Sequence, residues 1–272
     1  MNNQIKPQIL LTNDDGIKSP GLWAAAEALS RVGYVHVVAP RDQSSGTGRS
    51  YPNSSDGTIM EQTLQINGQD WQVYAVGGTP AQAVLHAVLE ILPLKPDLVV
   101  SGINYGENLG ESVTASGTVG AAMEAASQGI PALAISLEAS LEHQLGYSRQ
   151  VDFSAAGYFT ALFASRVLSR TLPDDVDVLK IDVPRDATVD TPWVVTQQAR
   201  NGYYFPCRPD RNQVDWERPV VVKYDINVNP VELPQDTDIY TVLVKKQVSV
   251  TPLSMNLTSR VSAHKLRQLL ES

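Results

Sequence analysis

The sequence predicts an α/β protein that is built on a mostly parallel sheet. Short apolar runs recur along the first two thirds of the chain, as at residues 9–11, 35–39 and 98–100. Strands that are buried on both faces carry such continuous apolar runs, which is typical of parallel sheets. Helical periodicity separates the runs, and polar residues follow them directly. Alternation of this kind predicts helices on both faces of the sheet and polar side chains at the carboxyl ends of its strands.

The first predicted strand, residues 9–11, is followed by Asp14, Asp15 and Gly16. Adjacent side chains on a strand point to opposite faces, so the two acids face one place only if the chain leaves the strand there. Gly16 permits such a turn. Two carboxylates with little positive charge nearby repel each other unless a cation lies between them. The sequence therefore indicates a site for a hard metal ion, and the alternative is that both acids only cap a turn or the next helix.

The next elements complete a βαβ unit. Ser19 and Pro20 are residue types that favour the N-cap and the first position of a helix, and the apolar positions that follow share one helical face. The β-branched run at residues 35–39 is the second strand, and a parallel pair joined by a helix fits the length of about thirty residues. The polar loop at residues 41–55 then lies at the same edge of the sheet as the two acids.

A second polar stretch follows the predicted strand at residues 98–100. It contains Asn104 and leads to an alanine-rich helix that we expect to begin near Gly117. The first turn of a helix offers unpaired backbone N–H groups and the positive end of the helix dipole, and this setting binds phosphate. We interpret Ser116, Gly117 and Thr118 as the start of a phosphate-binding helix.

The remaining elements divide the chain into a core at residues 1–183 and an arm at residues 184–272. The arm has sparse apolar runs, so we expect it to pack on a second copy of the chain in a homodimer or homotetramer. We predict a hairpin at residues 63–66 and 71–74 around Asn67 and Gly68, a helix capped by Thr79, strands at 130–137 and 176–183, a helix at 153–168, short strands at 193–195, 220–222, 239–244 and 248–253, and a terminal helix at 261–270.

Composition excludes several classes of protein. The 272 residues carry a formal net charge of −8, which argues against a nucleic-acid polymer or an anionic membrane surface as partner. A small phosphorylated substrate is still compatible with that charge, because a bound metal supplies positive charge locally. Cys207 is the single cysteine, so an internal disulfide and a thiolate zinc site are excluded. The first seven residues lack the apolar segment of a signal peptide, and we expect a cytoplasmic protein.

Three polar loops converge on the carboxyl edge of the predicted sheet. They carry Asp14 and Asp15, the pair Ser44 and Ser45, and Asn104. An all-oxygen set of ligands suits Mg²⁺, Mn²⁺ or Ca²⁺ rather than zinc. The phosphate-binding and nucleophile motifs G-x-x-x-x-G-K-[ST] and G-x-S-x-G are absent. We interpret the four histidines as structural or surface residues: His36, His86, His143 and His264.

This chemistry leaves two functional classes open. An oxygen-ligated cation beside a phosphate-binding helix start favours metal-assisted hydrolysis of a phosphoester. The alternative is a non-catalytic protein that binds a nucleotide or a sugar phosphate at the same edge, because fold alone does not separate binding from catalysis. The adjacent acids favour the enzyme, since a protein that only binds phosphate gains nothing from negative charge without a metal.

Several stretches of the chain together match one family pattern. They are residues 10–16, residues 37–40 with Ser45 and Gly46, residues 78–80, residues 99–104 with Gly106, Asn108, Leu109 and Gly110, residues 116–119 and 121–124, and residues 248–253. With these stretches, the chain resembles the SurE survival-protein family of 5′-nucleotidases. The resemblance covers most of the chain in order, and its most specific blocks are Asn-Asp-Asp-Gly and Ser-Gly-Ile-Asn. Residues 43–60, apart from Ser45 and Gly46, and residues 202–215 match the family pattern more loosely.

The resemblance implies a Rossmann-like three-layer α/β/α core with a C-terminal oligomerisation arm. It implies removal of phosphate from nucleoside 5′-monophosphates, with 3′-nucleotides and short polyphosphate as further substrates in some members. It also implies one divalent metal ion per subunit, held by Asp14, Asp15, Ser45 and Asn104. On this basis we expect one of the two acids to activate water, and we expect phosphate contacts from Asn104 and the helix start at residues 116–118.

Overall fold

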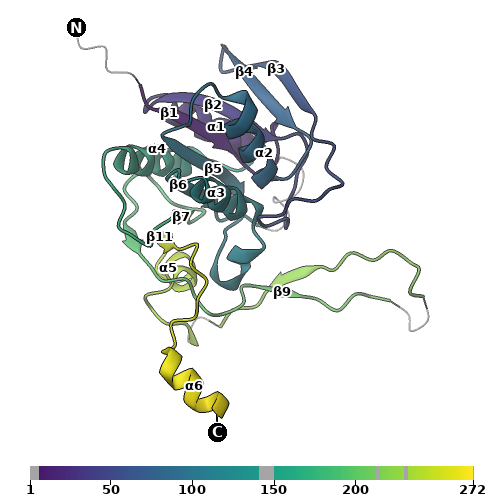
Figure 1. The fold of residues 1–272 in the computed structure, drawn as a ribbon, viewed down its shortest axis with the longest axis vertical. Helices are drawn as coiled ribbons and strands as arrows, with labels where there is room; N and C mark the ends of the chain where they lie inside the picture. Colours follow the sequence, from purple (N-terminus) through teal and green to yellow (C-terminus); the bar gives the residue numbers. More distant parts are fainter. Residues whose placement is uncertain (1–5, 141–149, 212–214, 230–231, 272) are drawn as a thin grey trace.

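A nine-stranded sheet forms the centre of the computed structural model, which describes residues 6–140, 150–211, 215–229 and 232–271. The strand order is β3-β4-β2-β1-β5-β6-β7-β11-β8, and all strands from β4 to β7 in this order run parallel (Figure 1). Only β3 and β11 run antiparallel to the neighbours β4 and β7. The predicted α/β class with a mostly parallel sheet is therefore confirmed.

The bounds of the elements are as follows. The strands are β1 (Gln8–Thr12), β2 (Tyr34–Pro40), β3 (Ile59–Ile66), β4 (Gln69–Val76), β5 (Leu98–Tyr105), β6 (Ala132–Leu137), β7 (Val178–Val183), β8 (Trp193–Val195), β9 (Tyr204–Pro206), β10 (Tyr224–Ile226) and β11 (Val248–Leu253). The helices are α1 (Pro20–Leu29), α2 (Pro80–His86), α3 (Gly117–Ser127), α4 (Ser154–Leu168), α5 (Asp238–Leu243) and α6 (Ala263–Glu271), with a π-helical turn η1 (Ala87–Ile91) and a 3-10 turn η2 (Gly110–Thr114).

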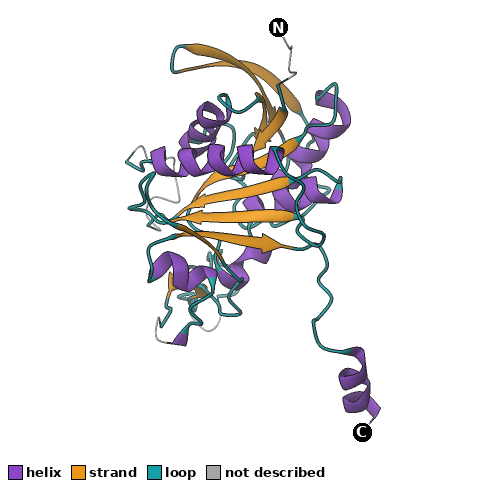
Figure 2. Ribbon diagram, turned by 90° about the vertical axis from the view of Figure 1, so that its left-hand side faces the viewer, coloured by secondary structure: helices purple, strands orange, loops and turns teal. Residues whose placement is uncertain are grey.

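Helices cover both faces of the sheet and produce the three layers (Figure 2). Leu11 of β1 packs in one apolar cluster with residues of α1 and α4, and Leu10 packs in another cluster with residues of α2 and α3. Successive strand residues therefore reach two different cores, which explains why the strands are apolar throughout.

The order of the strands reverses direction beside β1. From β1 the chain moves outward to β2 and β4, and it later returns to β5 on the other side of β1. The connections leave β1 and β5 in opposite directions, and open α/β sheets bind ligands at such a switch point. Asp14 follows β1 and Asn104 lies near the end of β5, so the fold positions two of the predicted site residues there.

Local signals locate most elements of the first 183 residues correctly. α1 begins at Pro20, Asn67 and Gly68 form the hairpin turn, and Thr79 caps α2 in a capping box with Gln82. The hydroxyl of Ser19 makes no capping bond, although Ser19 is the N-cap residue of α1. The strands predicted at residues 130–137 and 176–183 and the helix predicted at 153–168 are confirmed as β6, β7 and α4.

The predicted loop at residues 101–104 is wrong, because these residues belong to β5. The strand continues through Gly102 and Asn104 to Tyr105, and its register against β6 shifts between Ser101 and Asn104. Asn104 and Tyr105 still pair with Ser136 and Leu137 of β6, so the polar residues before them do not end the strand. Asn104 is therefore presented by the end of a strand and not by a loop.

Two strands predicted in the arm are also wrong. Residues 239–244 form most of helix α5, in which Ile239 and Val242 are buried in a cluster with Leu109 and Tyr203. This packing overrides the β-branched composition of the segment. The run at residues 220–222 forms no strand, and the pairing with β9 begins two residues later, in β10.

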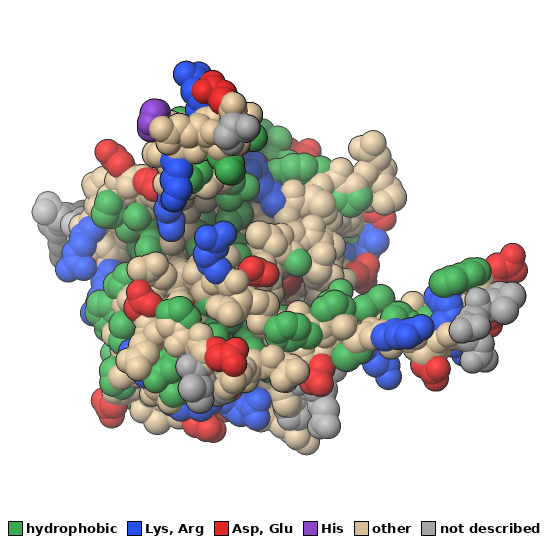
Figure 3. Space-filling view, turned by 90° about the horizontal axis from the view of Figure 1, so that it is seen from below, with side chains coloured by type: hydrophobic (Ala, Val, Ile, Leu, Met, Phe, Trp, Pro, Cys, Tyr) green, Lys and Arg blue, Asp and Glu red, His purple; other side chains and the backbone are tan. Residues whose placement is uncertain are grey.

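The C-terminal segment combines a part that joins the sheet with parts that leave it. β11 and β8 extend the main sheet beyond β7, as predicted for their positions at 248–253 and 193–195. β9 and β10 form a separate ribbon that projects from the body (Figures 1 and 3). Phe205 of β9 and Tyr224 of β10 are exposed, as is Trp216 in the segment between them. The terminal helix α6 is confirmed, and none of its residues is buried (Figure 2).

The division of the chain at residue 183 stays a prediction, because the segment from residue 184 contributes both to the sheet and to the projecting ribbon. His143 and the first five residues lie outside the described residues. Among the described residues, no helix has both the length and the apolar character that a membrane span requires.

Candidate functional site

The turn after β1 places Asp14 and Asp15 at the carboxyl end of that strand. The side-chain amide of Asn13 donates to Gly16 O, and the Gly16 N–H donates to Asn13 Oδ1, both at 3.1 Å. Gly16 has a φ of 94°, a conformation that glycine adopts without strain. The chain therefore leaves the strand here as the sequence predicts. Both acids are buried, with exposed fractions of 4% for Asp14 and 2% for Asp15.

Asp14 lies against the first turn of α3. The Thr118 hydroxyl donates to Asp14 Oδ1 at 2.6 Å. A Cβ atom at Gly117 would lie only 2.9 Å from Asp14 Oδ2, so the close approach requires glycine. The Ser116 hydroxyl accepts the Val119 N–H at 3.1 Å and caps the helix, as residues 116–119 of the sequence suggest. The positive end of α3 thus adjoins a carboxylate, and this arrangement places both features of the predicted site together.

Asp15 connects the other two segments of the site. Its Oδ2 accepts the Tyr105 N–H at 3.1 Å, and its Oδ1 accepts an N–H of the Gln43 side chain at 3.3 Å. The same Gln43 nitrogen lies 3.2 Å from Ser45 Oγ. The amide nitrogen of Asn104 donates to Gly106 O at 2.7 Å, so the amide oxygen is the atom that Asn104 has to offer a cation.

The structure therefore gathers all the predicted site residues around the end of β1. Asp14 contacts Thr118 and Gly117, while Asp15 is linked to Ser45 through Gln43. The roles assigned to these residues stay predictions. Sequence reasoning missed Gln43, since one glutamine in a polar loop carries no spacing signal.

Burial makes the charge of the two acids costly. It raises the pKa of Asp14, and burial together with the charge of Asp14 raises the pKa of Asp15 to about 8. The donors named above are a hydroxyl, a backbone N–H and a side-chain amide, all of them neutral. Two buried carboxylates with such partners favour a bound cation that restores both charges.

The donor set at this edge fits a hard divalent cation. It offers two carboxylates, the hydroxyl of Ser45 and the amide oxygen of Asn104, which are ligands that Mg²⁺ and Mn²⁺ accept. Across the part of the chain that the structure describes, no three His, Cys, Asp or Glu side chains gather into a metal-binding group. A metal site here therefore depends on neutral oxygen ligands beside the acid pair.

A second buried acid cluster lies behind the loop that follows β5. Lys180 Nζ donates to Asp182 and to Asp238, and all three side chains are fully buried. The N–H groups of Asn108 and Gly110 donate to Asp182 Oδ1 at 2.8 Å and to Asp238 Oδ2 at 3.1 Å. Sequence reasoning missed this cluster, although Lys180 and Asp182 at alternate positions of an apolar strand carry a signal for paired buried charges.

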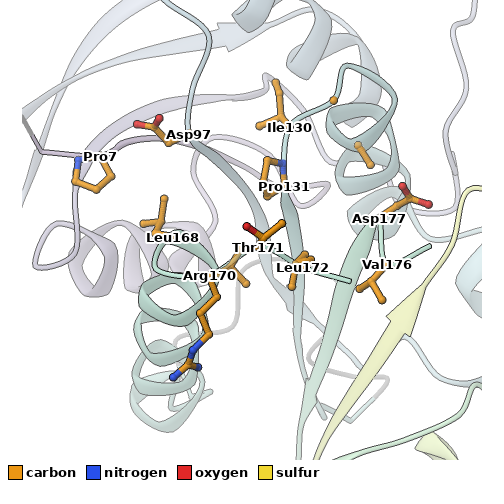
Figure 4. Close-up of a pocket in the computed structure, with 13 residues that line it drawn as sticks. Pro7, Asp97, Ile130, Pro131, Leu168, Arg170, Thr171, Leu172, Val176 and Asp177 are labelled. Atoms are coloured by element: carbon orange, nitrogen blue, oxygen red, sulfur yellow. The ribbon is translucent and has the colours of Figure 1, made fainter. Parts of the chain in front are cut away.

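A surface cavity of about 640 Å³ lies at the opposite edge of the sheet (Figure 4). Asp97, Pro131 and Asp177 line it and directly precede β5, β6 and β7. This is the amino edge of the parallel strands, away from Asp14 and Asp15. The cavity is therefore not part of the acid-pair site.

Fold and site together define a doubly wound α/β protein with an acidic, oxygen-rich site beside the start of a helix. The family model described as survival protein SurE matches residues 9–204. The chain is 40% identical to a 5′-nucleotidase SurE of Thermococcus gammatolerans over 97% of this chain and 96% of that protein. It is 39% identical to a 5′-nucleotidase SurE of Methanocella arvoryzae over 93% of each chain.

A solved structure supports the same relationship. The crystal structure of the SurE protein from Aquifex aeolicus is similar with a TM-score of 0.73 and 32% identity, and the match covers 97% of this chain and all of that one. The chain belongs to the SurE survival-protein family.

Proposed function

We propose that the chain is a divalent-metal-dependent phosphatase that hydrolyses nucleoside 5′-monophosphates to nucleoside and phosphate. The observation that carries the proposal is the buried pair Asp14 and Asp15 beside the first turn of α3. The relatives named 5′-nucleotidase SurE, which align over nearly the whole chain, support the same reaction.

The proposed metal site consists of Asp14, Asp15, Ser45 and Asn104 and holds one ion per subunit. When bound, such an ion neutralises charge on the phosphoryl group and lowers the pKa of a bound water. The protein's own contribution is to hold the ligands. Thr118 fixes one oxygen of Asp14, and the Tyr105 N–H fixes one oxygen of Asp15.

The proposed phosphate site is the start of α3 together with Asn104. The backbone N–H groups of Gly117 and Thr118 belong to the first turn, which has no intrahelical partners for them. The Ser116 hydroxyl accepts the Val119 N–H and keeps its own proton to donate to a phosphate oxygen. One of the two acids orients or deprotonates the attacking water, and both are retained as candidates.

The finer parts of the proposal concern substrates, assembly and compartment. We propose 3′-nucleotides and short polyphosphate as further substrates. We also propose that the protein is cytoplasmic, and cell fractionation tests this location. We also propose a homodimer or homotetramer formed through the arm. The exposed aromatic side chains of the β9–β10 ribbon and the wholly exposed helix α6 support contact with another copy.

Phosphate release from a panel of nucleoside 5′- and 3′-monophosphates and polyphosphate tests the reaction. We expect turnover of 5′-monophosphates with Mn²⁺ or Mg²⁺ and its loss with a chelator. Binding of nucleotides without turnover under any divalent ion would favour the non-catalytic alternative.

Light scattering tests the assembly. We expect a dimer or tetramer, with smaller species after truncation before Val261. A full-length monomer at micromolar concentration would contradict the arm proposal.

A further inference from the structure

The amide of Gln43 touches two of the proposed metal ligands at once. Its nitrogen lies 3.3 Å from Asp15 Oδ1 and 3.2 Å from Ser45 Oγ. Asp15 comes from the turn after β1 and Ser45 from the loop after β2, so this one side chain connects two separate segments of the site.

The chemistry of the two acceptors fixes the direction of these bonds. With a cation bound, Asp15 is ionised and its carboxylate only accepts hydrogen bonds, so the amide nitrogen of Gln43, and not the amide oxygen, faces Asp15. A primary amide has two N–H donors, one for each of the two oxygens. A carboxylate oxygen and a hydroxyl oxygen each carry two lone pairs, so one hydrogen bond from Gln43 is compatible with binding of a cation by both.

The backbone around Gln43 is itself fixed against the site. The Ser44 N–H donates to Asp14 O at 2.7 Å, and the Gly48 N–H donates to Ala115 O at 3.0 Å, just before the N-cap of α3. The loop is therefore attached on both sides of Ser45. These bonds hold the main chain, while the rotamer of Ser45 and the orientation of the Asp15 carboxylate depend on side-chain contacts such as those of Gln43.

We propose that Gln43 is a positioning residue for the metal site: its amide orients Asp15 and Ser45 toward the same ion. The inference rests on the metal site of the proposed function. Partners that orient metal ligands typically change metal affinity by 10- to 100-fold when they are removed. The exposed position of Gln43 places its contribution at the lower end of this range.

The test compares the wild-type protein with Gln43→Met, which keeps the length of the side chain and removes both donors. Isothermal titration of the metal-free protein with Mn²⁺, without any substrate, measures the affinity directly. We expect binding to be about tenfold weaker in Gln43→Met. Nucleotide turnover at saturating Mn²⁺ should stay within about twofold of wild type, because the amide positions ligands and does not touch the reacting atoms.

Gln65→Met is the matched control, since Gln65 is another exposed glutamine on the distant strand β3. It should bind Mn²⁺ like wild type. Equal Mn²⁺ affinity in wild type and Gln43→Met would overturn the inference and leave the proposed nucleotidase intact. If Gln43→Met lowers the melting temperature of the metal-free protein, Gln43→Ala is measured too, and unchanged affinity in that variant would equally overturn it.

Discussion

The two buried aspartate pairs of this protein differ in where their positive charge comes from. Asp182 and Asp238 share the ammonium group of Lys180 and also accept backbone N–H groups. Asp14 and Asp15 are as deeply buried, but the donors identified for them are neutral. The first pair is complete within the chain, whereas the second pair favours a cation from outside.

Burial raises the pKa of Asp182 as it raises the pKa of Asp14 and Asp15, but at Asp182 the charge of Lys180 opposes that shift. Burial alone would lower the pKa of the Lys180 ammonium, but the charges of Asp182 and Asp238 outweigh it and raise that pKa. At the acid pair, burial and mutual repulsion instead raise the pKa of Asp15 to about 8. The Lys180 cluster therefore carries its own positive charge, whereas the donors identified for Asp14 and Asp15 leave a bound cation favourable.

Removing the ammonium group of Lys180 should have the largest effect, and it should act on the stability of the fold. Lys180→Met leaves Asp182 and Asp238 buried without a positive partner, and we expect the free energy of unfolding to fall by about 3–5 kcal/mol. Urea unfolding followed by circular dichroism measures this change. Lys246→Met is the matched control, because Lys246 pairs with Glu138 at the surface and should cost less than about 1 kcal/mol. Equal losses in the two variants would contradict the comparison.

Neutralising either acid of the pair Asp14 and Asp15 should abolish nucleotide turnover and leave the fold intact. Asp14→Asn and Asp15→Asn each remove a carboxylate ligand, and we expect nucleotide turnover to fall by about 100-fold or more. The metal-free variants should be at least as stable as wild type, because repulsion between the acids is relieved. Asp97→Asn at the opposite edge should change neither property. Full activity of both site variants at saturating Mn²⁺ would refute the metal assignment.

The acid pair could be predicted from sequence because its signals are local. Asp14, Asp15 and Gly16 follow an apolar run directly, and turn chemistry and strand polarity decide where they point. Ser116 and Gly117 were located for the same reason, since a helix start is encoded within a few residues.

The contact of Lys180 with its acid partners could not be predicted in the same way. Lys180 and Asp238 are separated by 58 residues, and only the packing of α5 against the sheet brings them together. The residues after Asp238 indicate a strand by composition, and their burial against Leu109 and Tyr203 makes them a helix instead. Contacts between distant segments therefore decide both the element and its charge partner.

Removing a neutral ligand should have a smaller effect than removing an acid. Ser45→Ala and Asn104→Ala keep both carboxylates, and we expect Mn²⁺ affinity to fall by about tenfold in each. Excess Mn²⁺ should restore part of the activity, because these ligands position the ion and contribute no charge. Titration with Mn²⁺ measures the affinity, and circular dichroism checks the helix content. Unfolding of either variant would indicate a loop-stabilising hydrogen bond in place of a ligand role.

The smallest expected effect concerns stability and pH. Asp15 has an ordinary pKa of 3.8 and a folded pKa of about 8. For Glu107, burial raises the pKa from 4.5 to about 7. A raised carboxyl pKa means that the folded state keeps a proton that the unfolded chain has lost. The contribution of such a group to the free energy of unfolding is therefore complete below its ordinary pKa and is lost as pH rises through its folded pKa. Metal-free protein should therefore melt at a lower temperature at pH 8 than at pH 6, by about 2–4 °C for each kcal/mol lost.

Mn²⁺ separates the two contributions to that decline. The ion replaces the proton at Asp15, so the part of the decline that comes from the acid pair should disappear when Mn²⁺ is added. Glu107 accepts hydrogen bonds from the Tyr203 hydroxyl and the Ala139 N–H and is not one of the proposed metal ligands, so its part should persist with Mn²⁺ and vanish in Glu107→Gln. Differential scanning calorimetry between pH 6 and 8 measures both. The contrary result is a melting temperature of Glu107→Gln that falls between pH 6 and 8 by the same amount with and without Mn²⁺. Asp14 and Asp15 would then be neutralised within the chain, as Asp182 and Asp238 are, and the contrast between the two pairs would be lost.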